Sequence, residues 1–254
     1  MFRKPKLLPT VKLKHLDLIS TNEVDYAKTM TEISGYKNTW FRKKANFLKK
    51  FSANFVLINS YRNLDIVNLE ESKDCKIKRP DNIDFISFQA MCEIQALLGD
   101  GFSEDESIQD KMATAIAIAT FESHKGLDYD SEGKDFKKYI SKILDSDLIQ
   151  MIGLFNWISK SLEESAKMWS ERFSSVHVED EDYEMANGDR MSQFNVLQTV
   201  KQICSEFNVP FKEAWLMSYN LVQTNSYANA TSSKIQDDVR ILKEVKMNAK
   251  RNKQ

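Results

Sequence analysis

The stretch Met191–Val222, MSQFNVLQTVKQICSEFNVPFKEAWLMSYNLV, predicts two helices joined at a tight corner. Val209-Pro210 marks the corner, because proline disfavours helix in the residue before it and suits the first turn of a new helix. Apolar side chains recur at three- and four-residue steps, which places those of the first helix on one face: Phe194, Leu197, Val200, Cys204 and Phe207, then Phe211, Ala214, Trp215, Tyr219, Leu221 and Val222. A connection this short makes neighbours of consecutive helices. We therefore expect a rigid packing module here.

The composition extends this helical prediction to the whole chain. Hydrophobic residues make up 42% of its 254 residues, which is typical of a globular protein with a sizeable core. Only 7 glycines and 4 prolines are present, too few for the many turns of an all-β protein. The sequence predicts a mainly α protein, a multi-helix bundle with an extended basic N-terminal arm.

Helical periodicity and helix-end signals predict most of the elements. Ser103 and Glu106 have capping-box spacing and predict the start of an alanine-rich helix. The helix from Asp147 to Phe173 is expected to be the longest. Ile235, Val239 and Leu242 give the last helix a thin apolar stripe. The predicted helices cover residues 23–33, 40–58, 83–98, 104–119, 135–144, 147–173, 194–207, 211–222 and 227–247.

The predicted organisation has five consecutive segments. These are an extended arm (1–22), a basic helical segment (23–82), a central helical domain (83–176), an acidic loop (177–190) and a C-terminal helical module with a basic tail (191–254). Residues 61–82 fit either a small hairpin or a loop, and both interpretations stay open.

Charge is unevenly distributed along a chain whose net charge is only -1. Residues 1–50 hold 12 Lys and Arg against 4 Asp and Glu, and residues 235–254 hold 6 against 3, so the body between them is acidic. Such ends are either solvated surface or arms that dock on acidic neighbours, on other subunits or on nucleic acid. The basic helix 40–58 is also compatible with nucleic acid or a membrane surface, besides an ordinary surface helix.

No catalytic or metal-binding pattern emerges from the sequence. None of the three histidines, His15, His124 and His177, lies within helical reach of another histidine or of a cysteine, so they lack a zinc signature. Residues 128–133, DYDSEG, match the start of a calcium loop, but Tyr139 occupies the position of the bidentate glutamate. A turn before the next helix explains them better. We expect no enzyme activity, no cofactor and no membrane span, since no apolar run approaches 18 residues.

Two segments carry a resemblance to a known group of proteins. Residues 84–98, DFISFQAMCEIQALL, and residues 207–218, FNVPFKEAWLMS, resemble helical structural and assembly proteins of tailed bacteriophages, and the Lys/Asn/Ile-rich style is similar to crAss-like phages of Bacteroidetes. The resemblance covers residues 83–249. It implies a virion connector or ring protein between portal and tail, or a tail-assembly chaperone, with no catalytic residues.

We therefore expect a structural protein of the virion, made in the host cytoplasm. Its partners would be copies of itself in a ring and neighbouring portal, connector or tail proteins, with DNA contact as an alternative. Exposed charge pairs are worth little, so apolar groups of the arm must also be buried. The interface candidates are Lys4, Lys6, Leu7, Leu8, Leu13, Arg42, Lys43, Lys44, Glu179, Asp180, Glu181, Asp182, Arg240 and Lys243.

Overall fold

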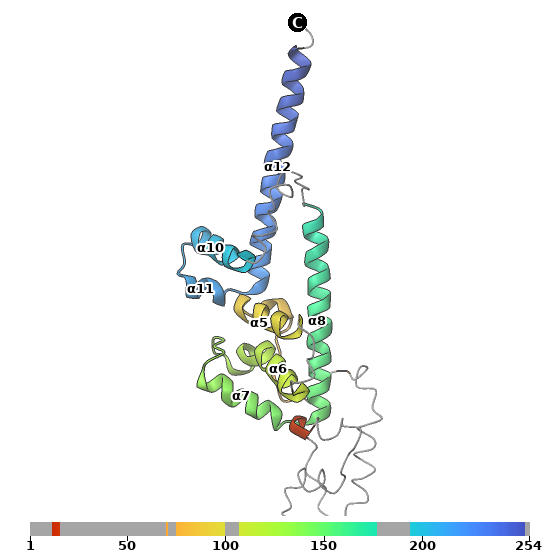
Figure 1. The fold of residues 1–254 in the computed structure, drawn as a ribbon, viewed down its shortest axis with the longest axis vertical. Coiled ribbons are helices and arrows are strands. Elements are labelled where there is room, and N and C mark those ends of the chain that lie inside the picture. The colour runs from red at the N-terminus through yellow and green to blue at the C-terminus, as the bar shows by residue number, and fades with distance from the viewer. Residues whose placement is uncertain (1–11, 16–69, 71–74, 100–106, 177–193, 252–254) are drawn as a thin grey trace, which may run out of the picture. The chain divides into compact units, whose positions relative to one another are not determined.

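The computed structural model describes residues 12–15, 70, 75–99, 107–176 and 194–251, and this part of the chain is mainly α (Figure 1). Its β pairing consists of two isolated bridges, Lys12 to Asp147 and Ser87 to Ser218. The predicted fold class is confirmed. The elements are η1 (Leu13–His15), η3 (Ile83–Phe85), α5 (Phe88–Gly99), α6 (Ile108–Lys125), α7 (Lys134–Leu144), α8 (Leu148–Ser174), α10 (Asn195–Phe207), α11 (Phe211–Leu216) and α12 (Tyr219–Arg251).

The chain divides into two compact units that are discontinuous in sequence. The first combines residues 1–79 with 93–160, and the second combines 80–92 with 161–254. This division differs from the consecutive segments that the sequence suggested. The predicted helices 23–33 and 40–58 and the acidic loop lie outside the described residues, as does most of 61–82. The described part of that segment, residues 70 and 75–82, is irregular.

The first unit is built around α6, which is buried along most of its length. Its alanines leave room for close packing, and the helix contacts both α7 and η1. Ser107 caps α6, since its hydroxyl accepts a hydrogen bond from the Asp110 N–H. The helix therefore begins four residues later than the predicted cap at Ser103. Gly126 ends it in the left-handed conformation, which glycine adopts at little cost.

A tight turn precedes α7, where the sequence resembles half a calcium loop. The Asp130 carboxylate accepts a hydrogen bond from the Glu132 N–H at 3.1 Å, and the Gly133 N–H donates to the Asp130 carbonyl at 3.0 Å. Hydrogen bonds of this kind are common for an aspartate in a turn. The interpretation as a turn before a helix is confirmed.

The second unit contains the predicted corner, and its first half is as expected. α10 ends at Asn208, which has a φ of 51° and so terminates the helix in the left-handed region. Pro210 then caps α11. The second predicted helix, however, is broken at Met217–Ser218, because the backbone there pairs with Ser87 and Phe88 instead of continuing the helix.

The buried face of α10 differs from the predicted one. Val200 and Ile203 are buried, whereas Phe194, Leu197 and Phe207 are exposed. Apolar residues occur on more than one side of this helix, and contact with the rest of the unit selects Val200 and Ile203. The single apolar face in the prediction was wrong.

Among the described helices the longest is α12, not α8 as predicted. It has 33 residues against the 27 of α8. The sequence predicted its start near Tyr227 and left that start open because of Thr231-Ser232-Ser233. In the structure the Thr231 hydroxyl donates to the Tyr227 carbonyl at 2.8 Å, a bond that satisfies it inside a helix.

Candidate self-assembly surface

The first half of α12 is anchored to its own unit. Val222 is buried, and the Tyr227 ring packs edge-on against Phe173 at 5.9 Å between centroids. Asn225 and Asn229 donate hydrogen bonds to the carboxylate of Glu206 on α10. These bonds, together with one from Gln202, hold the pKa of Glu206 below its ordinary value, with Asn225 the largest contributor. The last described anchor is Lys234, whose ammonium donates to the Ser175 carbonyl at 3.0 Å.

Beyond Lys234 the helix continues with its side chains exposed. Figure 1 shows this half of α12 in dark blue. Between residues 235 and 249 only Asp237 is half-buried. Six large apolar side chains in this segment are between 43 and 59% exposed: Ile235, Val239, Ile241, Leu242, Val245 and Met247.

Three of these residues define one line along the helix. Ile235, Val239 and Leu242 are spaced by four and then three residues, so they lie on the same side of α12. We call these three residues the α12 stripe. Ile241 and Met247 lie at other angles around the helix axis. Exposed apolar rows of this kind on soluble domains mark interaction surfaces more often than scattered single residues do.

The charged interface candidates on α12 are also exposed. Arg240 reaches Asp237 within the helix at 3.4 Å, with the Arg240 side chain largely in solvent and that of Asp237 about half exposed. Such a pair contributes little to stability. Lys243 lies one residue after the α12 stripe's Leu242 and is exposed. The structure thus leaves both predicted residues accessible to a partner.

A second exposed apolar group lies around the corner in the same unit. Its members are between 38 and 48% exposed and come from the two short helices and the start of α12: Phe194, Val196, Leu197, Phe207, Phe211 and Leu221. The corner therefore combines a packed interior, where Trp215 contacts Phe88 at 5.6 Å between ring centroids, with an apolar exterior.

Leu13 occupies a different place from the one predicted. Its side chain is 0% exposed and packs within its own chain, where η1 contacts α6 and α7. Its backbone N–H donates to the Ser146 carbonyl at 3.0 Å. The sequence predicted that Leu13 contacts a neighbouring subunit, but in this structure Leu13 is buried against its own subunit.

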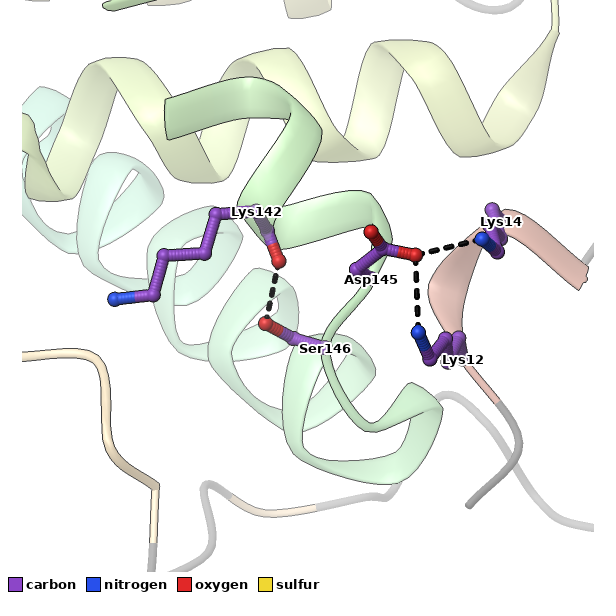
Figure 2. A network of polar contacts seen from close by, with 5 residues as sticks. All are labelled: Lys12, Lys14, Lys142, Asp145 and Ser146. Carbon is purple, nitrogen blue, oxygen red and sulfur yellow. Dashed lines mark hydrogen bonds and ion pairs between the residues drawn. The ribbon is translucent and has the colours of Figure 1, made fainter. Parts of the chain in front are cut away.

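Two lysines at η1 both pair with one carboxylate at the end of α7 (Figure 2). The ammonium groups of Lys12 and Lys14 lie 3.1 and 2.6 Å from the same oxygen of Asp145. Hydrogen bonds from Lys14 and then Lys12 lower the pKa of Asp145. The basic arm was predicted from the sequence, but its contact with Asp145 was not, since an acid at a helix end has many possible roles.

The remaining interface candidates lie outside the described residues. They are the arm residues Lys4, Lys6, Leu7 and Leu8, the basic-helix residues Arg42, Lys43 and Lys44, and the acidic-loop residues Glu179, Asp180, Glu181 and Asp182. Their contacts stay a prediction.

His124 is the histidine whose surroundings the structure describes. Its ring stacks on Tyr139 at 5.3 Å, and its Nδ1 accepts a hydrogen bond from the Lys78 N–H at 3.2 Å. The Lys142 ammonium lies 3.1 Å from the other ring nitrogen. Burial, followed by the charges of Lys142 and Lys125, lowers the pKa of His124. This histidine joins α6, α7 and the segment before η3.

Neither a metal-binding cluster nor a membrane-spanning helix occurs in the described part of the chain. It holds no group of three or more His, Cys, Asp or Glu side chains arranged for a metal ion. None of its helices combines the length and the apolar character that crossing a membrane requires.

Comparison with known proteins adds no further assignment. No protein-family model, no curated protein and no solved structure matches this chain. The α12 stripe is therefore the feature of the structure on which a functional proposal can be based. Its signal was visible in the sequence as the spacing of Ile235, Val239 and Leu242, but periodicity alone does not tell a stripe that faces the core from one that faces solvent.

Proposed function

We propose that this protein is a structural component of a tailed-phage virion, a multi-copy ring or connector protein at the portal–tail junction or in the tail. The observation that carries the assembly role is the α12 stripe, an apolar row on a helix with no described neighbour. The assignment to a phage particle rests on the resemblance of residues 84–98 and 207–218 to phage structural and assembly proteins.

The physical argument concerns the stability of exposed apolar surface. Each large apolar side chain removed from water contributes about 1.5–3 kcal/mol when fully buried. A stripe of three, with Val245 beside it, therefore offers several times the energy of an exposed ion pair. Lys243, beside the stripe, would set register and orientation more than affinity.

The exposed group at the corner supplies a second surface for the same role. A subunit of a ring needs two different contact surfaces, one for each neighbour. The corner and the α12 stripe are two such surfaces on one unit. Both are apolar, as is typical of the central part of stable interfaces.

Quantitative mass spectrometry of purified particles tests the proposal. The expected result is that the protein is present at a fixed multi-copy ratio to the portal protein. Its absence from mature particles, together with its presence in infected cells bound to a tail protein, would replace the proposal with the tail-assembly chaperone.

A binding titration tests the nucleic-acid alternative separately. The purified protein would be mixed with duplex DNA at low and at moderate salt. Binding that weakens steeply with added salt would support a DNA role for the basic segment 37–50, because displaced counterions give such binding its salt dependence. No binding at low salt would remove that alternative.

A further inference from the structure

We propose that the α12 stripe pairs with the same stripe of a second copy to form a short parallel two-stranded coiled coil. This inference rests on the proposed function in taking another copy as the partner, and it names the residues and the geometry of the contact. It covers the helix from Ile235 to Ala249.

The spacing of the stripe fits a coiled-coil heptad. With Val239 at position a and Leu242 at position d, Ile235 falls at the preceding d, Lys246 at the next a and Ala249 at the next d. A β-branched residue at a with leucine at d favours two strands, and a single lysine at an a position specifies oligomer state at some cost in stability. The pattern is short, and Ile235, a β-branched residue at d, does not itself favour two strands, so Val239, Leu242 and Lys246 carry the preference for a dimer.

Charge complementarity selects a second copy in parallel orientation. Asp238 falls at position g and Lys243 at the following e position, and both side chains are exposed. In a parallel pair, residue g of one helix meets residue e of the next heptad on the other. Asp238 of each copy would therefore face Lys243 of the other. In an antiparallel pair, g faces g and e faces e, so the contacts between Asp238 and Lys243 would be lost.

The isolation of this segment supplies a further reason for pairing. Helical stability in proteins comes mostly from packing of an apolar face, and a helix in water without such packing is marginal. From Ile235 to Ala249 the only half-buried described side chain is Asp237, although the sequence places Ile, Val and Leu at heptad positions. Pairing would bury that row and stabilise the helix that presents it.

Sedimentation velocity of the full chain over a range of concentrations tests the inference. The unmodified protein is expected to show reversible self-association. Leu242→Asp should raise the Kd about a hundredfold, because both copies lose a buried leucine. A protein that stays monomeric at all concentrations, or a Leu242→Asp variant with unchanged Kd, would overturn the proposal.

Ile241→Asp is the matched control. Ile241 is the adjacent residue, it is similarly exposed, and it falls at position c, away from the stripe. The same substitution on the same helix should leave the Kd within about twofold of the original. If Ile241→Asp weakens association as much as Leu242→Asp does, the heptad assignment is wrong.

Charge reversal and cross-linking test the orientation. Asp238→Lys and Lys243→Asp should each raise the Kd by about two- to fivefold, and the double variant should restore it. Under oxidising conditions Ala249→Cys, at position d, should form an intermolecular disulfide, whereas Met247→Cys, at position b, should not. Cross-linking at 247 but not at 249, or no rescue in the double variant, would contradict a parallel pair.

The outcomes separate this inference from the proposed function. If the protein is found in the particle but Leu242→Asp leaves its self-association unchanged, the proposed function stands and the coiled coil is wrong. If the protein pairs through the stripe but is absent from particles, the coiled coil stands and the virion role is wrong. If both hold, a ring built from such pairs contains an even number of copies.

Discussion

Leu13 and Asp145 hold the same short segment on the first unit, but they do so by different physics. Leu13 is fully buried, whereas the side chain of Asp145 is half in solvent and binds two partly exposed lysines. Burial of an apolar side chain depends little on salt, while ion pairs in solvent are screened by it. The apolar anchor should therefore dominate the docking of residues 12–15.

Substitution at each position separates the two contributions. Leu13→Ala should lower the free energy of unfolding by about 3 kcal/mol, as expected for a buried leucine whose site does not collapse. Asp145→Asn should lower it by less than about 1 kcal/mol, and the effect should shrink in high salt. Urea denaturation of both variants at low and high salt measures this. A larger loss for Asp145→Asn than for Leu13→Ala would contradict the assignment.

His124 gives the first unit a dependence on pH. Its pKa in the folded protein is lowered from the ordinary value of 6.5, so the folded state binds the proton less well than the unfolded state does. Its contribution to stability is therefore fully present above 6.5 and is lost as the pH falls below that value. The nearby positive charges of Lys142 and Lys125 act in the same direction as burial.

The expected measurement is a loss of stability between about pH 7.5 and pH 5.5, where His124 becomes charged against its surroundings. His124→Asn should be less stable at the higher pH and should show a weaker pH dependence over this interval. Chemical denaturation of both proteins at several pH values gives the difference, in which the contributions of other histidines cancel. An identical pH dependence for the variant would show that His124 is not the responsible group.

At the scale of elements, α12 separates into an anchored half and an exposed half. A protein that ends at Lys234 keeps the described contacts of α12 with α10 and with the end of α8. We expect its free energy of unfolding, measured at concentrations where the full chain is monomeric, to change by less than about 1 kcal/mol. Its helical circular dichroism should fall, because the removed segment is helical.

A large loss of stability on this truncation would contradict that division, since it would mean that the segment after Lys234 packs on the rest of the chain. The control is a protein that ends at Asn225, which removes the Tyr227–Phe173 contact and the Asn229 hydrogen bond to Glu206. This shorter protein should be clearly destabilised.

The elements show what the sequence could predict and what it could not. Periodicity located α7 and α8 within a residue or two, and Asp147 was correctly placed at the start of α8, where its carboxylate accepts from the Gln150 N–H. Such features depend on neighbours in sequence. The break at Met217–Ser218 depends on residues 86–88, more than a hundred positions away, and no local pattern announces it.

The candidate surface illustrates the same limit. The spacing of Ile235, Val239 and Leu242 predicted a stripe but not its exposure, because exposure depends on whether another element covers it. Leu13 shows the converse case. Its place in a basic segment that contains two prolines suggested an arm for a neighbour, whereas an apolar site within the same chain accepts it.

At the scale of the whole molecule, the second unit depends on a short segment from earlier in the chain. Residues 80–92 contribute Phe88, whose ring contacts Trp215 and stacks on Tyr219 at 6.2 Å between centroids. They also contribute Asp84, a buried carboxylate that accepts a hydrogen bond from the Ser165 hydroxyl at 2.5 Å. The backbone N–H of Tyr219 donates to the Ile86 carbonyl at 2.9 Å, which fixes the start of α12.

A fragment of residues 161–254 should therefore fold incompletely by itself and recover when a peptide of residues 80–92 is added. The peptide contains no tryptophan, so the fluorescence of Trp169 and Trp215 in the fragment reports the recovery directly. A blue shift that saturates with peptide concentration is expected, because both the ring contacts and the buried hydrogen bond form only with the peptide present. A peptide with Phe88→Ala should bind about a hundredfold more weakly or not at all. A fragment that already unfolds cooperatively, and whose fluorescence ignores the peptide, would show that the contacts of Phe88 and Asp84 are not needed to form the second unit.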